Sequence, residues 1–404
     1  MKIKRRTVLK GLSAAALVPA VTVRGSAQAG AKVLKFGAPL PLTGPLAPEG
    51  VRQRQGFDSW LTKVNETGGI KAGGDTYKVE IVYIDYQSNT PRAVQSAERL
   101  INEDKVQFLF APFGSAAVKA VSAVTEKYGV PMVAPNAASE QVYDQGFKYL
   151  FGVYTPNHTL AQPMVKLVRQ KRPNLKRLSI LARNDLFPLA MAAEIEKAAK
   201  EEGLEVVYNE KYAIGTVDFS SPFTEMRSRR PEWIFISGYT NDLILARKQL
   251  REQGVTGDLL TMAVGPATAE FQNGVGALGE GVTTFAWWDK ATKYKGVDIF
   301  GSAEAYADYF EKQYKILPDY SQAGSAACGV IFQLAIEKVG SIDRAKVRDA
   351  IAAMDLMTFY GPIKFGPSGQ ISSLKPPIIQ LQDKVMKVVY PPEIAQAELR
   401  FGFK

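Results

Sequence analysis

The sequence predicts an α/β protein made of two doubly wound lobes, and two observations carry this prediction. Short apolar runs alternate with helical patterns from residue 33 to about residue 285, which is typical of right-handed β-α-β units and of parallel sheets covered by helices on both faces. The alternation is interrupted at Phe151–Asn157 (FGVYTPN), after four β-α units, and a second set of similar length ends at Phe285–Lys290 (FAWWDK). One sheet holding both sets would be large, so we expect two lobes with the chain crossing between them more than once.

Eight short apolar runs are the strand candidates of the two sets: Val33–Ala38, Val79–Asp85, Val106–Phe110, Val130–Ala134, Leu178–Ala182, Glu205–Tyr208, Trp233–Ser237 and Leu259–Met262. In the first helical pattern, four apolar side chains recur at i, i+3, i+4 and i+7, on one face of a helix: Phe57, Trp60, Leu61 and Val64. Gly68 and Gly69 are expected to end this helix, because glycine readily adopts the left-handed conformation found there. The next helix is expected to have Thr90 as its N-cap and Pro91 in its first position.

Longer helical patterns follow the second set, at Ala303–Tyr314, Gln322–Val339 and Arg344–Met354. The segment YGPIKFGPSGQ (residues 360–370) is expected to form a hairpin, and Ile378–Gln382 a terminal strand.

The first 29 residues predict a cleaved export signal. Four basic residues, Lys2, Lys4, Arg5 and Arg6, precede the uncharged stretch Gly11–Val23, and Ala27 and Ala29 form an A-x-A cleavage site. The Arg5–Arg6 pair resembles a twin-arginine signal. Since no segment approaches the roughly 20 apolar residues that span a bilayer, we expect a soluble periplasmic protein after cleavage near Ala29.

The excess of positive charge comes mostly from this signal. The whole chain has 50 basic and 40 acidic residues, and residues 1–29 hold six of the basic ones and no acidic one. The remaining 44 basic residues nearly balance the 40 acidic ones, and no basic run is interleaved with aromatic residues. We therefore expect no nucleic-acid partner.

Residues with catalytic or metal-binding chemistry are scarce. His158 is the only histidine and Cys328 the only cysteine, and Cys328 lies in the apolar helical segment AGSAACGVIF, where a buried thiol is expected. The segment GVGALG (Gly274–Gly279) matches G-x-G-x-x-G by letter, but it follows a helical pattern and precedes a strand, the reverse of a dinucleotide site. We therefore expect no cofactor, no metal site and no enzymatic activity. The alternative from another class of function is an exported enzyme of similar architecture.

Two junctions rich in small residues follow neighbouring strands: APFGSAAVKAV (residues 111–121) and MVAPNAASEQV (residues 132–142). Strand ends that open into helix N-termini present free backbone N–H groups, which attract anions. Ser115 could offer its hydroxyl, and Ala117, Asn136 and Ala138 their N–H groups. The alternative, that Ser115 and Ser139 are ordinary N-caps, carries equal weight on this chemistry alone.

The order of five segments resembles the branched-chain amino acid (leucine/isoleucine/valine) binding family among the exported solute-binding proteins of ABC transporters: KFGAPLPLTGPLAPEG, GGIKAGG, VEIVYIDYQSNTPRAV, FGSAAVKAVSAVTEKYGVPMVAPNAAS and YGPIKFGPSGQ. The resemblance implies two Rossmann-like lobes of the type I periplasmic binding fold, joined by three hinge crossovers, with a ligand cleft between them. It places residues 30–155 and 285–375 in lobe 1, and residues 156–284 and 376–404 in lobe 2. It also implies a monomer that delivers a small carboxylate-bearing solute to an ABC permease.

The same resemblance implies a set of ligand-binding positions. In lobe 1 they are Ser115, Asn136, Ala137 and Ala138 for the ligand carboxylate, with Glu49 at the position of a lid residue. In lobe 2 they are Phe187, where the family usually has tyrosine, Asn157, near an acidic position, and the aromatic Tyr239. Near the family's expected glutamate this chain has AVGPAT (Ala263–Thr268), without a charge.

The missing acid leaves the ligand open. Micromolar binding corresponds to about 8 kcal/mol, and an ammonium buried without its counter-charge costs about 3–5 kcal/mol. Either Glu49 or another acid replaces the family's partner, or the ligand has no ammonium. The resemblance favours an amino acid slightly, and the alternatives are aromatic or short aliphatic acids and amides. Which of Trp287 and Trp288 faces the cleft stays open at this stage.

Overall fold

The first lobe contains a six-stranded sheet with the strand order β2-β3-β1-β4-β5-β6. The computed structural model describes residues 32–403, and the predicted export signal lies outside them. All neighbouring strands of this sheet run parallel except β2, which pairs antiparallel with β3. The strands are β1 (Lys32–Leu40), β2 (Ile70–Ala72), β3 (Asp75–Asp85), β4 (Phe108–Phe110), β5 (Met132–Ala134) and β6 (Leu150–Gly152).

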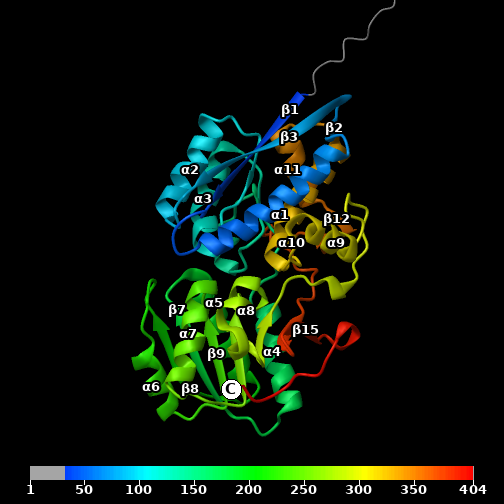
Figure 1. Cartoon of the computed structure of the whole chain (residues 1–404). Coiled ribbons are helices and arrows are strands. Elements are labelled where there is room, and N and C mark those ends of the chain that lie inside the picture. Colours follow the sequence, from blue (N-terminus) through cyan, green and yellow to red (C-terminus); the bar gives the residue numbers. More distant parts are fainter. Residues whose placement is uncertain (1–31, 404) are drawn as a thin grey trace, which may run out of the picture. The chain divides into compact units, whose positions relative to one another are not determined.

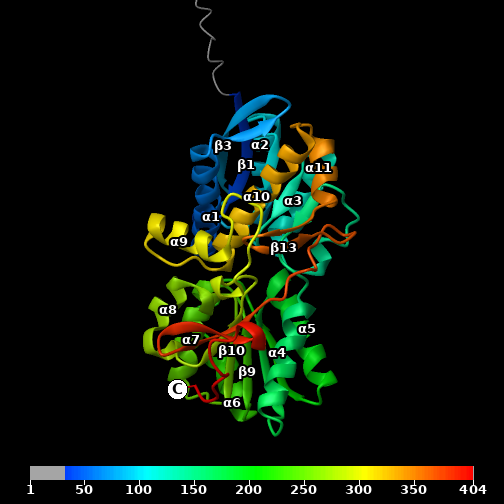
Figure 2. The same cartoon turned by 90° about the vertical axis from the view of Figure 1, so that its right-hand side faces the viewer.

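Helices cover both faces of this sheet, as Figures 1 and 2 show. They are α1 (Ala47–Glu66), α2 (Thr90–Asn102), α3 (Ser115–Tyr128), α9 (Ala303–Tyr314), α10 (Tyr320–Val339) and α11 (Arg344–Ala352). Strand β4 shows how the two cores form, because its residues alternate between the faces. Phe108 and Phe110 pack in one core with Trp60 of α1 and Phe332 of α10, whereas Leu109 packs in the other with residues of α2 and α3.

The second lobe contains a seven-stranded sheet with the order β15-β14-β11-β10-β9-β7-β8. The strands are β7 (Arg177–Arg183), β8 (Glu205–Tyr212), β9 (Trp233–Ser237), β10 (Leu259–Ala263), β11 (Val282–Phe285), β14 (Ile378–Gln382) and β15 (Val385–Tyr390). Strands β7 to β11 pair in parallel, and β14 and β15 pair antiparallel at one edge. The helices are α4 (His158–Lys171), α5 (Leu186–Glu201), α6 (Ser220–Ser228), α7 (Thr240–Glu252) and α8 (Ala269–Val275).

The chain passes between the two sheets three times. It leaves the first sheet after β6, returns after β11 to form α9, α10 and α11, and leaves again before β14. The predicted fold class, α/β with two doubly wound lobes, is therefore confirmed. Among residues 32–403 no single helix is long and apolar enough to cross a membrane, and α10 and α11 meet that test only as a pair bent by 110°.

Several local predictions need correction. The N-cap of α2 is Asn89, whose side chain accepts the Arg92 N–H, and Thr90 is already helical. Strands β2, β6 and β15 were not predicted, because three-residue strands and a strand that closes a short hairpin lack a long apolar run. The predicted hairpin is displaced, since β13 (Gly361–Lys364) pairs with the preceding β12 (Asp355–Thr358); the rest of that segment closes a turn through a Phe365–Ile371 bridge.

Candidate ligand-binding site

A pocket lies where the two lobes meet, with about 350 Å³ of empty space when open solvent at its mouth is included. Twelve residues line it: Arg52, Phe113, Gly114, Asn136, Ala138, Tyr154, Phe187, Tyr239, Val264, Trp287, Tyr320 and Ser321. Most of them follow the carboxyl ends of the parallel strands β4, β5, β7, β9 and β10, where doubly wound sheets bind ligands. The pocket thus lies at the edge where the sequence predicted a cleft.

Aromatic rings form most of the pocket wall. Six of the twelve lining residues are aromatic: Phe113, Tyr154, Phe187, Tyr239, Trp287 and Tyr320. The rings of Tyr154 and Trp287 are stacked, with centroids 4.0 Å apart and 4° between their planes. Phe113 of lobe 1 meets Tyr239 of lobe 2 edge to face at 5.4 Å. These rings pack on one another by stacking and by edge-to-face contacts, which makes the wall of the pocket predominantly apolar.

The structure resolves which tryptophan faces the pocket. Trp287 lines it, next to Tyr320 at a centroid distance of 5.3 Å. Trp288 packs edge-on against Tyr306, and its indole N–H donates to the Phe359 carbonyl.

Four lining residues carry buried polar atoms without a hydrogen bond inside the described part of the chain: Arg52 Nε, Asn136 Nδ2, Trp287 Nε1 and Ser321 Oγ. Of these, Arg52 Nε has an ion-pair partner, Asp319, at 3.3 Å. The hydroxyl of Tyr154 donates to Asn136 Oδ1 at 2.5 Å, which orients the amide. An amide nitrogen and an indole nitrogen are donors only, and the serine hydroxyl can donate as well. The pocket therefore offers donors and calls for an acceptor on the ligand.

The two small-residue junctions lie side by side, as the parallel sheet requires. Gly114 is the N-cap of α3, with φ of +87°, so Ser115 is not the N-cap. The Ser115 hydroxyl accepts the Ser139 N–H at 3.3 Å, and Ser139 Oγ makes no hydrogen bond, so neither serine is a capping side chain. Neither is among the lining residues, and the role of Ser115 in binding stays a prediction.

The predicted alanines differ in position. Ala138 lines the pocket, and its carbonyl accepts from the amide of Gln370, which also bonds the Tyr154 carbonyl. Ala137 is buried in the lobe 1 core, and its carbonyl accepts from the Tyr143 hydroxyl. Ala117 lines a second, smaller pocket, separated from the first by Phe113 and Tyr239.

In lobe 2, the predicted Phe187 and Tyr239 both line the pocket. Asn157 is fully buried at the start of α4, with both amide atoms unpaired, and does not belong to the lining. In the uncharged segment AVGPAT, Val264 has φ of +87° and its carbonyl accepts from the Tyr320 hydroxyl at 2.9 Å. A positive φ is unusual for a β-branched residue, and it aims this carbonyl across the cleft.

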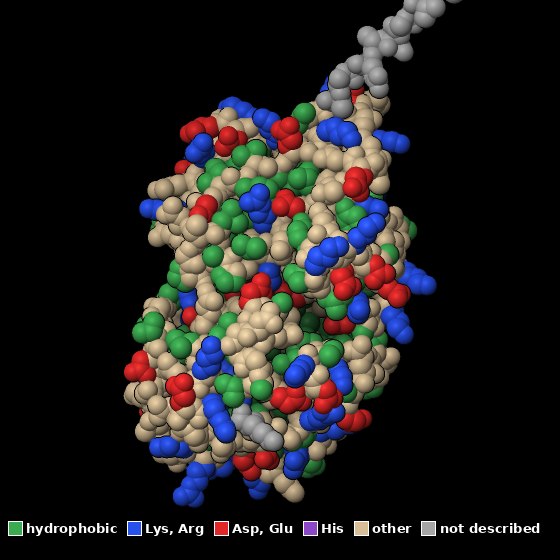
Figure 3. Space-filling model, in the orientation of Figure 1, with side chains coloured by type: hydrophobic (Ala, Val, Ile, Leu, Met, Phe, Trp, Pro, Cys, Tyr) green, Lys and Arg blue, Asp and Glu red, His purple; other side chains and the backbone are tan. Residues whose placement is uncertain are grey.

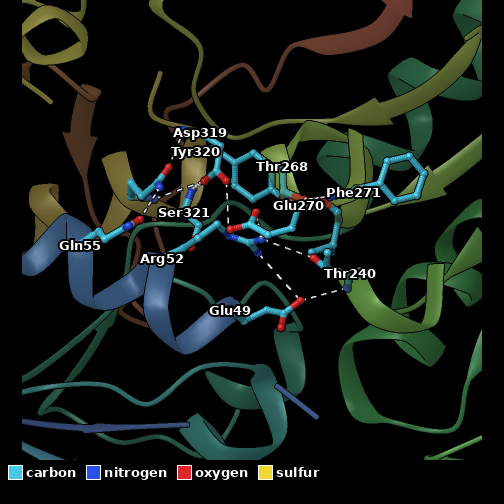
Figure 4. A network of polar contacts seen from close by, with 12 residues as sticks. Glu49, Arg52, Gln55, Thr240, Thr268, Glu270, Phe271, Asp319, Tyr320 and Ser321 are labelled. Atoms are coloured by element: carbon cyan, nitrogen blue, oxygen red, sulfur yellow. Dashed lines mark hydrogen bonds and ion pairs between the residues drawn. The ribbon is translucent and has the colours of Figure 1, made fainter. Parts of the chain in front are cut away.

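The sequence did not indicate Arg52, which is the cation of the pocket wall. Its side chain is only 3% exposed and lies within 3.3 Å of Asp319, 3.4 Å of Glu270 and 3.9 Å of Glu49. Burial disfavours its charge, but these three carboxylates outweigh burial and raise the pKa of Arg52 above its ordinary value. Figure 4 shows how the acids surround the guanidinium. The i, i+3 spacing of Glu49 and Arg52 was the single trace of this cluster in the sequence.

Glu49 lies beside the pocket and is not part of its lining. Its Oε1 accepts the backbone N–H of Thr240 at 2.9 Å, across the cleft in lobe 2. Among residues 32–403, no aspartate or glutamate belongs to the lining of the pocket.

The other candidates for chemistry lie elsewhere. Cys328 is fully buried in α10, which raises its pKa well above the ordinary value. His158 lies on the surface with its ring 3.2 Å from Glu140. The segment GVGALG leads from α8 through a 3-10 turn toward β11, which confirms that a helix precedes it. No group of three or more potential metal ligands occurs among the described residues. On the face in Figure 3, basic and acidic side chains are interspersed.

Comparison with known proteins identifies a family for this arrangement. A family model described as "Periplasmic binding protein" matches residues 33–373. The Leu/Ile/Val-binding protein homolog 7 of Brucella abortus is 27% identical over 400 residues, covering 95% of this chain and 98% of the relative.

Two solved structures share the fold. The branched-chain amino acid substrate-binding protein LivJ of Streptococcus pneumoniae, in complex with isoleucine, aligns with a TM-score of 0.78 at 22% identity, covering 89% of this chain and 100% of LivJ. A solute-binding protein from R. palustris, in complex with benzoate, aligns with a TM-score of 0.76 at 21% identity, covering 88% and 95% of the two chains.

Proposed function

Because the chain belongs to the periplasmic binding protein family, we propose that it is an exported receptor that binds a small carboxylate-bearing solute between its lobes and delivers it to an ABC permease. The pocket between the lobes supports this function. A ligand that contacts both lobes shifts the protein toward the closed arrangement, which the permease then recognises.

Within this function, we propose an aromatic carboxylate without an ammonium group as the ligand. The observation that carries this is the pocket lining, with six aromatic rings, one guanidinium and no acidic side chain. An α-amino acid would bury its ammonium without a carboxylate partner, at a cost of about 3–5 kcal/mol. This proposed ligand differs from the amino acid that the family resemblance slightly favoured.

The unpaired donors give the carboxylate a position. Asn136 Nδ2, Ser321 Oγ and Trp287 Nε1 are available to donate to it, and a hydrogen bond to a charged group contributes about 1.5–3 kcal/mol. Arg52, held by its acids in the same wall, adds a positive charge. Three such bonds and an aromatic contact of about 0.5–1.5 kcal/mol add up to about 5–10.5 kcal/mol, a range that contains the roughly 8 kcal/mol of micromolar affinity.

A branched-chain amino acid is the second candidate, because the curated relatives are named Leu/Ile/Val-binding protein homologues. Their identity of 27% leaves room for a different ligand in the same fold. The solved neighbours illustrate this range, since one is in complex with isoleucine and another with benzoate.

A thermal-shift screen of the refolded, ligand-free mature protein tests both candidates. Benzoate and hydroxybenzoates are expected to raise Tm, because a ligand at 100 times its Kd stabilises the native state by about 2.7 kcal/mol. Leucine, isoleucine, valine and phenylalanine are expected to leave Tm unchanged. Benzamide is the matched control, since it keeps the ring and removes the charge.

The outcomes of the screen test the ligand class and the receptor function separately. Stabilisation by leucine, isoleucine or valine and not by aromatic acids would overturn the ligand class and leave the receptor function standing. No stabilisation by any acid or amino acid would leave the receptor function unsupported.

A further inference from the structure

We propose that Glu49 and Arg52 are positioning residues that hold the two lobes closed, and that protonation of Glu49 favours the closed arrangement by removing the cost of burying its charge. The residues form an inter-lobe charge cluster, defined as Glu49, Arg52, Thr240, Glu270 and Asp319 (Figure 4). This inference rests on the proposed function only in the experiment that measures ligand affinity. It concerns how tightly the lobes close, whereas the pocket lining determines which ligand binds.

Three contacts of the cluster cross the cleft. Glu49 Oε1 accepts the Thr240 N–H at 2.9 Å, at the first residue of α7. The Nη1 atom of Arg52 lies 3.4 Å from both Thr240 Oγ1 and Glu270 Oε2, which belong to lobe 2. Glu49 and Arg52 belong to α1 of lobe 1. All three contacts join atoms of the protein, so the chain itself supplies part of the closing interaction.

Lobe 1 holds Arg52 in place for these contacts. Asp319 Oδ2 lies 3.3 Å from Arg52 Nε, and Asp319 is fixed as the N-cap of α10 by the backbone N–H groups of Ser321 and Gln322. The Gln322 side chain also donates to Gln55 of α1 at 2.9 Å. Because α1 and α10 are tied together beside Arg52, its guanidinium stays directed at lobe 2 with little further loss of conformational entropy on closure.

The cluster contains three carboxylates and one cation, so its charges do not balance. Asp319 receives two backbone N–H groups and Arg52, which favour its charged form. The Glu270 side chain is 41% exposed and therefore solvated. Glu49 is the least supported carboxylate, because it is fully buried, its Oε2 has no hydrogen bond and Arg52 lies 3.9 Å away.

Burial raises the pKa of Glu49 above its ordinary value of 4.5, although Arg52 and Thr240 act in the opposite direction. Burial also raises the pKa of Asp319. Three tyrosines carry an electrostatic coupling to Glu49, and burial raises the pKa of each above 10, so they stay neutral and bring no counter-charge: Tyr86, Tyr239 and Tyr320. The remaining charged groups of the cluster are those named above.

The sign of the pH dependence follows from the burial of Glu49 by closure. When the lobes separate, Glu49 loses the Thr240 N–H and gains water, so its pKa returns toward the ordinary value. A group whose pKa is higher in the closed form takes up a proton on closure. The closed form, and with it the affinity for any ligand, therefore gains as pH falls through the raised pKa, and the gain is complete below 4.5.

The central experiment uses Glu49→Gln, which keeps an oxygen acceptor for the Thr240 N–H and removes the titrating group. Small-angle X-ray scattering of the ligand-free mature protein at about pH 8 and about pH 4.5 is expected to give a smaller radius of gyration at the lower pH. The E49Q radius should be the same at both pH values. The variant Arg52→Met should have a larger radius of gyration than the wild type at both pH values, because its lobes are more open.

The second measure is benzoate affinity by calorimetry over the same pH range. In the wild type the Kd is expected to fall with pH, by at most about tenfold per unit for one proton, with proton uptake on binding. In E49Q the Kd and proton uptake should lose this dependence. The E49Q variant should change the affinities of benzoate and a hydroxybenzoate by the same factor.

The control variant is Asp319→Asn, which removes the other buried carboxylate of the cluster and should keep the pH dependence. A pH dependence that persists in E49Q, or one that only D319N removes, would overturn the role of Glu49. Identical radii for the wild type and R52M would overturn the closing contact. If benzoate does not bind, the proposed ligand class is wrong, and the scattering result still tests the role of Glu49 and Arg52 in closing the lobes.

Discussion

Asn136 shows, at the scale of one residue, which chemistry this pocket offers. Its Oδ1 accepts the Tyr154 hydroxyl at 2.5 Å, so its Nδ2 is left as a buried donor without a partner in the chain. An unmade hydrogen bond of a buried group costs about 1–3 kcal/mol. An acceptor on the ligand removes that cost, and a carboxylate gains more than a neutral group.

The variant Asn136→Asp is expected to weaken benzoate binding by roughly a hundredfold or more. It has the same shape and still accepts from Tyr154, but it replaces a donor with a negative charge that faces the ligand carboxylate, and the lost charge-assisted bond alone contributes about 1.5–3 kcal/mol. Calorimetric titration measures the change. Asn89→Asp is the matched control, because aspartate caps α2 as well as asparagine does, and its affinity should equal that of the wild type. An N136D affinity within a few-fold of the wild type would place the carboxylate elsewhere in the pocket.

At the scale of elements, the close approach of α1 and α10 supports the charge cluster. A Cβ on Gly329 of α10 would lie 2.1 Å from Trp60 of α1, and a Cβ on Gly56 of α1 would lie 2.3 Å from the Gln322 carbonyl of α10. Glycine at these two positions lets the helices pack closely enough for Gln55 to meet Gln322. The packing of these helices thus positions Arg52 toward lobe 2.

The variant Gly329→Ala is expected to lower the free energy of unfolding by about 1–3 kcal/mol, because the added methyl group overpacks against Trp60. Denaturant unfolding followed by fluorescence measures this loss. Gly324→Ala in the same helix is the control, since its nearest atom would lie at 3.3 Å and alanine favours the helix. Equal stabilities of G329A and G324A would contradict the close-packing argument.

At the scale of the whole molecule, the two lobes form the walls of one pocket. The ligand pocket joins two lobes that the chain connects three times, an arrangement suited to opening and closing around a solute.

The rival exported enzyme predicts that a bound solute is consumed. We expect the purified protein to return benzoate chemically unchanged after prolonged incubation, as measured by mass spectrometry of the released ligand. A heat-denatured sample is the control for spontaneous decay. A product that forms only with the native protein would favour the enzyme.

The sequence by itself determined the fold class and a third of the pocket lining, four of its twelve residues. The alternation of apolar runs and helical patterns predicted both sheets, with β9 and β14 at their observed bounds, because strand and helix periods are local properties of the chain. The small-residue junctions led to Asn136 and Ala138, and the family resemblance to Phe187 and Tyr239. These residues follow strand ends, and a parallel sheet brings such ends to one edge whatever the details of packing.

Only the tertiary structure decided the rest of the pocket and the inter-lobe charge cluster. Arg52, Trp287 and Ser321 lie far apart in the chain and meet because three crossings dock one lobe on the other. Glu49 and Thr240 are separated by 191 residues, and their hydrogen bond exists only when the lobes touch. Burial, charge balance and unpaired donors are properties of that contact between lobes, and no local pattern in the sequence encodes them.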